Sequence, residues 1–512
     1  MAEQTNIAAG RSRIARNTVF LYFRMFLLML IGLYTSRVVI HALGIEDYGV
    51  YGAVGGVVAL FSILTGSMSA AISRFLTYEL GRKEAHPDRV FSSAVSIQLI
   101  ISLFVILLSE TAGLWWLENK VVVPEGRMVA ARWVFQFSVL TFVFQLVSVP
   151  YNAVLIAREK MDAFAFIGVI EGLLKLGVAF AIAAAPLDKL IFYAFLMCLV
   201  SLIVRLMYGI YCRRRFREAR YTWSLDGGLF KEMFAFAGWN FIGAGAGVLR
   251  DQGGNQLLNL FFGPAANAAW LVASQVNGAV QKFVTSFVTA LNPQITKSLA
   301  SGEKDYMMRL VFKGSKLSVF LLLLVAAPVL LYADPLLSLW LGKTVPEHAS
   351  YFVRGVLLLS LIEAVSHTMV TAVLSTGRIR NYQLVVGGLV LLNIPIDYVL
   401  IRWLGAGPGV IYQVAVGIAL VCLAARILFM RRMLGMDVAA FCRDILSREA
   451  VVTAFALLLP RWLFAGMQGS LWMIAAGCAL TVLLTLAAIW ILGCDRSERS
   501  FLIQKIQAFL HR

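Results

Sequence analysis

The sequence predicts an all-α membrane protein that crosses the bilayer about fourteen times. Of its 512 residues, 60% are hydrophobic and only 14% are charged, with a mean hydropathy of +0.80. Soluble chains are closer to half apolar and a quarter charged. Apolar runs long enough to span the hydrocarbon core recur along the whole chain, and basic residues gather in alternate connections between them. These three observations define the fold class.

The individual spans follow from the length of each apolar run. About 20 mostly apolar residues are needed for one helix to cross the bilayer, whereas barrel strands alternate over about ten residues. The runs are continuous, so they favour helices. The predicted spans are 18–41, 48–77, 91–117, 128–155, 163–185, 190–211, 232–260, 266–292, 310–333, 351–375, 382–403, 408–430, 449–467 and 470–493.

The distribution of Lys and Arg predicts the orientation. If the N-terminus is cytoplasmic, the inside segments hold about 27 basic residues and the outside segments about five, in agreement with the positive-inside rule. The net charge of +17 is explained in this way, and no basic stretch with interleaved aromatics suggests nucleic acid. We therefore expect a multi-pass protein with both termini in the cytoplasm and membrane lipids around it.

A weak internal repeat predicts the domain organisation. A shift of 219 residues (263 − 44) places Gly44 on Gly263 and Tyr51 on Trp270, at the turn between two spans in each half. The two halves would be parallel repeats, a common frame for secondary transport with the substrate between the lobes. The predicted parts are an N-lobe of spans 1–6 (1–212), a C-lobe of spans 7–12 (213–431), and two additional spans with a cytoplasmic amphipathic tail (432–512).

One stretch carries a family resemblance. Its motifs are Arg16-Asn17-Thr18, Ser36-Arg37-Val38-Val39, Leu43-Gly44-Ile45-Glu46-Asp47-Tyr48-Gly49-Val50-Tyr51, Gly66-Ser67-Met68 and Arg74-Phe75-Leu76. With these motifs the chain resembles the Wzx-type polysaccharide flippases of the MATE-like MOP superfamily. The resemblance implies a bacterial inner-membrane protein that moves an undecaprenyl-diphosphate-linked oligosaccharide to the outer leaflet by alternating access, for surface polysaccharides such as O-antigen. It also implies polysaccharide polymerase and glycosyltransferase partners, and coupling to H⁺, Na⁺ or the membrane potential without a cofactor.

Four basic residues inside the spans are candidates for binding the diphosphate. A charge at bilayer depth costs several kcal/mol unless it meets a cavity, a partner or the interface. Arg engages phosphate oxygens bidentately, and Lys offers a compact charge. The alternatives are that Arg74 extends to the interface and that Arg250 and Asp251 form a structural pair, although helix neighbours point about 100° apart. The candidates are Arg24, Arg74, Arg250 and Lys282.

Four other residues are candidates for ion coupling: Asp251, Glu363, His367 and Asp397. Glu363 and His367 are one helical turn apart and form either a simple ion pair or a proton relay, because His titrates near neutral pH. Asp397 follows Pro395, where a kink frees carbonyl groups for a cation.

A strip of polar residues in the seventh span allows two interpretations. Its members are Gln252, Asn255, Gln256 and Asn259, and Gln275, Asn277 and Gln281 of the eighth span belong with them. Hydrogen bonding between helices is their ordinary use in membranes. Contact with a sugar or headgroup in a wet cavity is the alternative.

Other function classes are less compatible with the sequence. A cation-coupled multidrug or metabolite exporter of the same superfamily would favour carboxylates and aromatics in its cavity. A glycan polymerase or acyltransferase would need a large outer loop or a cluster of His and acids, and neither is visible. The five His form no metalloprotease motif, the six Cys show no metal spacing, and position 337 is Leu where a P-loop requires Gly. The sequence thus predicts a transporter, not an enzyme, and no metal site.

Overall fold

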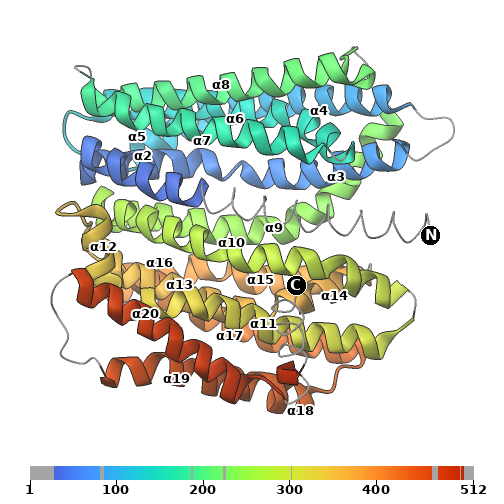
Figure 1. The fold of residues 1–512 in the computed structure, drawn as a ribbon. Coiled ribbons are helices and arrows are strands. Elements are labelled where there is room, and N and C mark those ends of the chain that lie inside the picture. Colours follow the sequence, from blue (N-terminus) through green and yellow to red (C-terminus); the bar gives the residue numbers. More distant parts are fainter. Residues whose placement is uncertain are drawn as a thin grey trace, which may run out of the picture. The chain divides into compact units, whose positions relative to one another are not determined.

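The computed structural model describes residues 28–80, 86–158, 160–185, 188–222, 227–300, 302–376, 378–463, 471–495 and 498–500. These residues are almost entirely helical, and no strand occurs among them (Figure 1). The prediction of an all-α polytopic membrane protein is confirmed. By its internal contacts the chain separates into two compact units, Met1–Ala268 and Ala269–Arg512.

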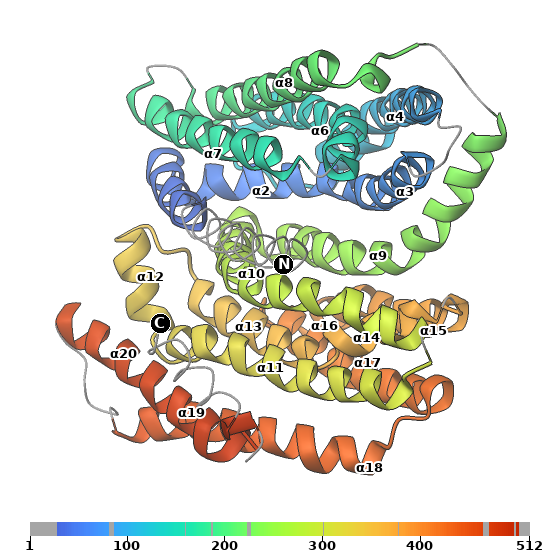
Figure 2. The same ribbon diagram turned by 45° about the vertical axis from the view of Figure 1, so that its right-hand side comes forward.

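The first unit is a helical bundle in which α6 lies along α8 and is packed by α2, α3 and α4 (Figures 1 and 2). Its core includes the fully buried rings of Phe91 and Phe135. The helices are Leu28–Leu43, α2 (Ile45–Ala59), α3 (Ser62–Leu80), α4 (Pro87–Leu108), α5 (Leu114–Asn119), α6 (Met128–Ala157), α7 (Met161–Ala184), α8 (Lys189–Arg215) and α9 (Gly227–Phe262), with a π-helical turn at Ser109–Gly113 and a 3₁₀ turn at Arg217–Ala219.

The second unit contains most of α10 (Pro264–Ala300) and the helices that follow it. Within it α11 packs against α13, α14, α19 and α20, and α17 packs against α13, α15 and α16. Its helices are α11 (Lys304–Leu331), α12 (Ala333–Leu341), α13 (Ala349–Val365), α14 (His367–Ser375), α15 (Arg380–Leu391), α16 (Asn393–Leu404), α17 (Val410–Leu434), α18 (Val438–Phe441), α19 (Ser447–Leu463) and α20 (Leu471–Ala488), with π-helical turns at Cys442–Leu446 and Ile489–Gly493.

Each of the fourteen predicted runs is mostly helical where the structure describes it, with breaks inside some runs, as at Leu60 and Phe61, at Ser366 and at Leu392. Eight described helices are long and apolar enough to cross a membrane, or up to ten if each of two bent pairs is one span. The helices α9 and α10 are long enough but more polar, and α19 has 17 residues. The total of about fourteen therefore stays a prediction. The tail 496–512, predicted to be amphipathic, lies outside the described residues except for 498–500.

Large apolar side chains point outward from many of these helices. Trp462 and Trp472 are 77% and 82% exposed, near the end of α19 and the start of α20. In water such exposure would be costly, whereas tryptophan is enriched where a membrane meets water. The surface is thus suited to a lipid environment.

The repeated glycines of the sequence have the same backbone conformation. Gly44 separates helix Leu28–Leu43 from α2, with a bend of 115°, and Gly263 separates α9 from α10. Their φ angles are 83° and 77°, in the left-handed region that favours glycine. A side chain at Gly49 would place its Cβ 1.9 Å from the carbonyl oxygen of Pro264. The Tyr-Gly motif therefore lets α2 approach the start of α10. The division at 212 and 431 stays a prediction.

Candidate substrate site

The predicted second span is interrupted within the first unit. Helix α2 ends at Ala59 and α3 begins at Ser62, so the chain makes a turn at Leu60 and Phe61. The turn is tight, because the Phe61 amide donates to the carbonyl of Val58 at 3.1 Å. Leu60 keeps right-handed helical angles (φ −55°, ψ −34°), so the interruption is a 3₁₀-like turn, and such turns inside a span often mark functional hinges. Broken helices of this kind form the binding sites of many transporters.

A cavity of 410 Å³ lies beside this interruption, and we call it the α2–α3 cavity. Four helices of the first unit, α2, α3, α6 and α8, form its walls. None of the lining side chains is charged. They are Tyr51, Gly55, Val58, Ala59, Ser62, Thr65, Gly66, Ser138, Thr141, Phe142, Gln145, Ala194 and Met197.

The polar groups of the cavity are hydroxyls and one amide, which both donate and accept hydrogen bonds. Thr65 is the most informative of them. Its Oγ1 atom is buried and has no hydrogen-bond partner in the described part of the chain. Buried polar atoms are almost always satisfied by protein, water or ligand. The cavity is therefore able to bind a neutral, hydroxyl-rich group, and the rings of Tyr51 and Phe142 add apolar faces to its wall.

Side-chain amides of α9 fix the position of α2 in the cavity wall. Asn255 donates to the carbonyl of Gly52 at 3.1 Å, and Gln256 donates to the carbonyl of Ala53 at 2.9 Å. Asn259 donates to Asn267 at 2.8 Å. The side chains of Asn255, Gln256, Asn259 and Asn267 are all buried. Hydrogen bonding between helices is thus the use that the structure shows for most of the predicted polar strip.

The predicted diphosphate-binding residues are not among the residues that line the α2–α3 cavity. Arg24 lies outside the described residues, and Arg74 lies on α3 with its side chain outside the description. Arg250 of α9 pairs with Asp251 at 2.9 Å. We did not expect these neighbours to face each other, but the long Arg side chain bends back to reach the carboxylate. Lys282 is exposed on α10 in the second unit.

The Glu363 and His367 candidates lie at a bend of 42° between α13 and α14. Between them Ser366 accepts a hydrogen bond from Nη1 of Arg426 on α17, at 2.7 Å. The Nε2 atom of His367 is buried without a hydrogen-bond partner among the described residues. Arg426 was not among the residues predicted from the sequence, although a basic residue inside the predicted span 408–430 is a visible signal.

Asp397 lies on α16 in a strongly buried position, 2% exposed. Its helix begins after a break at Leu392, three residues before Pro395. Asn393 is one helical turn earlier, also 2% exposed, and its amide donates to the carbonyl of Val390 at 2.7 Å. The Oδ1 atoms of Asp397 and Asn393 both have no hydrogen-bond partner within the described part of the chain. Two unsatisfied oxygens at this spacing suit a proton or a small cation.

Among the described residues, no three His, Cys, Asp or Glu side chains are grouped as a metal site would require.

The polar residues of the α2–α3 cavity were not predicted from the sequence. Hydroxyls inside a span most often bond to their own helix backbone, and only the broken helix shows which of them line a cavity.

Comparison with known proteins agrees with this architecture. The family model described as "Polysaccharide biosynthesis protein" matches residues 14–299, and the MatE model matches residues 256–399. The structure of the lipid II flippase MurJ in an inward closed conformation has a TM-score of 0.71 at 12% identity, covering 92% of this chain and 99% of that one. An inward-facing multidrug resistance MATE transporter of the MOP superfamily has a TM-score of 0.61 at 12% identity, covering 79% and 94%.

A sequence relative is the uncharacterized membrane protein EpsK of Bacillus subtilis (strain 168), 20% identical over 337 residues. That match covers 63% of this chain and 66% of EpsK, which is less than two thirds of the relative. The polysaccharide model covers more than half of the present chain, and the two structural relatives share its fold. The chain therefore belongs to the polysaccharide biosynthesis protein family and has the fold of MOP-superfamily flippases and transporters.

Proposed function

We propose that this protein flips an undecaprenyl-diphosphate-linked oligosaccharide from the cytoplasmic to the outer leaflet of the bacterial inner membrane, for surface polysaccharide synthesis. The supporting observation is the α2–α3 cavity beside the broken span, which has hydroxyl and amide groups but no charged lining residue. A neutral sugar matches these groups. A cationic drug would gain most from a carboxylate, so the multidrug exporter is less well supported.

The diphosphate requires positive charge in addition to this cavity. Arg24, Arg74, Arg250 and Lys282 remain the candidates for this charge in a transport cycle of alternating access. The lipid tails would stay in the bilayer while the head passes. Neutralising Arg24 together with Lys282 should abolish export while the protein still inserts and folds. Full export by that double variant would remove the diphosphate role of these two residues.

The Thr65 hydroxyl provides a direct test of the sugar-binding cavity. Replacing Thr65 by Val keeps the shape and removes an oxygen that has no described protein partner, so the fold should lose little stability. Substrate export in liposomes should fall about tenfold for a lost hydrogen bond of about 1.4 kcal/mol. Thr35→Val is the matched control, because its Oγ1 is also buried and unsatisfied but lies outside the cavity.

The assay would follow an undecaprenyl-diphosphate sugar in liposomes, in parallel with efflux of a cationic dye. The wild-type protein should export the sugar lipid, Thr65→Val should lose most of this export, and Thr35→Val should export at nearly the wild-type rate. Dye efflux without sugar-lipid export would instead identify a drug exporter. Equal activity of the two Thr variants would contradict binding of the sugar in this cavity.

The coupling ion is proposed to bind at Asn393 and Asp397. Asp397→Asn removes the ionisable oxygen at nearly constant volume, so export driven by a proton or sodium gradient should be lost. Glu347→Gln is the control, since its side chain is 85% exposed. An unchanged response of Asp397→Asn to both gradients would exclude this site. Glu363, His367 and Asp251 are then the remaining candidates for coupling.

The topology and partners follow from the same proposal. Both termini should be cytoplasmic, which reporter fusions at each end would check. Polysaccharide polymerase and glycosyltransferases are the expected partners, because they consume and supply the lipid-linked sugar. Crosslinking in the intact membrane would show whether they contact this protein.

A further inference from the structure

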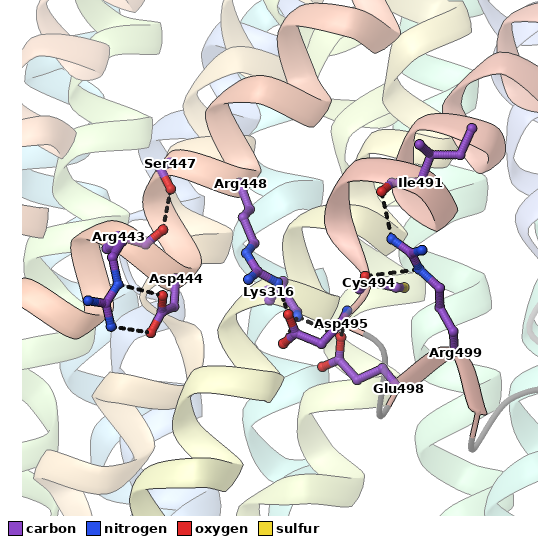
Figure 3. Close-up of polar contacts among 10 residues, drawn as sticks. All are labelled: Lys316, Arg443, Asp444, Ser447, Arg448, Ile491, Cys494, Asp495, Glu498 and Arg499. Atoms are coloured by element: carbon purple, nitrogen blue, oxygen red, sulfur yellow. Dashed lines mark hydrogen bonds and ion pairs between the residues drawn. The ribbon is translucent and has the colours of Figure 1, made fainter.

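A second pocket, of 610 Å³, lies within the second unit at one end of its helices. The predicted orientation places this end on the cytoplasmic side. We call it the α11 pocket, because α11 contributes six of its lining residues. Figure 3 draws part of the lining: Lys316, Asp444, Arg448, Asp495 and Glu498. It is lined by Asp305, Met308, Arg309, Phe312, Lys313, Lys316, Asp437, Asp444, Ile445, Arg448, Asp495 and Glu498.

Part of this charged lining is neutralised by ion pairs within the protein. The Nζ atom of the buried Lys316 is 2.7 Å from Glu498 and 3.7 Å from Asp495. Arg448 of α19 also pairs with Asp495 (Figure 3). Two cations therefore face two carboxylates, and this part of the wall has little net charge left to attract a ligand.

Two basic side chains of the same pocket are not neutralised. Arg309 and Lys313 are exposed, one helical turn apart on α11, and no carboxylate of the described residues forms an ion pair with either. The guanidinium carbon of Arg309 lies over the ring of Tyr306, 5.9 Å from its centroid. Guanidinium and ammonium groups at this spacing suit a phosphate group.

Two acidic side chains of the pocket are likewise not neutralised by an ion pair. Asp305 lies in the first turn of α11, and Asp437 precedes α18, where it accepts a hydrogen bond from the Ala440 amide at 3.0 Å. Neither forms an ion pair with a cation in the described part of the chain. The third acid, Asp444, is paired with Arg443 at 2.9 Å. The free charges of the pocket are thus two positive and two negative.

From this balance we propose that the α11 pocket binds the zwitterionic headgroup of a phosphoethanolamine lipid. The phosphate would contact Arg309 and Lys313, and the ammonium would donate to Asp305 and Asp437. The pocket lies at the end of membrane helices, and α20 exposes apolar Leu483 and other side chains on which acyl chains can pack. This site is independent of the flipped substrate and of the α2–α3 cavity.

The experiment measures lipid retention by the full-length purified protein, using native mass spectrometry and thermal melting. Phosphatidylethanolamine should be retained more strongly than phosphatidylcholine, whose quaternary ammonium has no N–H to donate. Retention of phosphatidylethanolamine should also exceed retention of phosphatidylglycerol, whose headgroup has no positive charge. Inorganic phosphate should compete only weakly, because it satisfies one half of the site.

The double variant Arg309→Gln/Lys313→Gln should lower phosphatidylethanolamine retention about tenfold or more, since two charge-assisted contacts are lost. Asp305→Asn should reduce the preference for ethanolamine over choline. Lys304→Gln is the matched control, an exposed Lys at the start of α11 outside the pocket. Equal retention of the three lipids, stronger retention of phosphatidylglycerol, or unchanged retention in the double variant would each overturn the proposal.

Discussion

Replacing Lys316 by Met tests whether buried charges hold the last two helices onto α11. The Lys316 side chain is 3% exposed and reaches Glu498 and Asp495, which follow α20. It also attracts the carboxylate of Glu449 on α19, which is buried and has no hydrogen-bond partner among the described residues. Met is similar in length but has no charge, so Glu498 and Glu449 would lose this cation and Asp495 would keep only Arg448.

The expected cost follows from the burial of this lysine. Losing a hydrogen bond to a charged group costs about 1.5–3 kcal/mol, and Glu498, whose side chain is 17% exposed, is the carboxylate left without its closest cation. Lys304→Met, at an exposed position of α11, should change stability by about 0.5 kcal/mol or less. Adding Glu498→Gln to Lys316→Met should restore part of the loss, because one of the uncompensated carboxylates is then removed.

Thermal melting of the protein in detergent micelles would measure these differences, and labelling of Cys494 would report locally. Cys494 is a buried residue, 9% exposed, next to Asp495, and its thiol should react faster once the end of α20 detaches. Lys316→Met should lower the melting temperature and accelerate labelling. If Lys316→Met instead has the same melting temperature as Lys304→Met, and Cys494 stays protected from labelling, the ion pairs of Lys316 do not anchor these helices.

Two further predictions concern the first unit. Asp188 caps α8 by accepting from two amides and pairs with Arg127, so Asp188→Ala should cost about 0.5–2 kcal/mol and Asp188→Asn less. Burial raises the pKa of Asp188, but the Arg127 hydrogen bond and the capping amides outweigh it and lower the pKa below 3.8. Its contribution is therefore present above pH 3.8 and lost at lower pH, and melting curves of wild type and Asp188→Asn should converge on acidification. Gly49→Ala should cost at least about 1–3 kcal/mol in melting experiments, because its Cβ meets backbone oxygen, whereas Gly32→Ala meets nothing within 4 Å and should be nearly neutral.

The helices were predictable because the bilayer fixes the length of an apolar segment, and the predicted runs are mostly helical where the structure describes them. The paired glycines were predictable for a related reason, since a left-handed residue between two helices favours Gly. The break at Leu60 and Phe61 was not predictable. These two residues are apolar and continue the run, so nothing in their composition indicates a turn.

The candidate site was predicted less well than the fold. Charge alone identified Arg250 and Asp397, but the structure places Arg250 beside Asp251, and only Asp397 is buried with an unsatisfied oxygen. Thr65 has no local sequence signal, because its unsatisfied hydroxyl is visible only when α3 is placed against α6 and α8. The role of a polar residue in a span depends on its neighbours on other helices.

The sequence by itself determined that this chain is a membrane-embedded helical protein, because hydropathy and basic residues act locally and need no partner. It also carried the family motif, whose Gly44 and Gly49 are required by backbone geometry. Only the tertiary structure decided where the α2–α3 cavity lies, which acids and bases neutralise each other, and which remain available in the α11 pocket. Those properties depend on distances between segments far apart in the chain, and no periodicity along the sequence encodes such distances.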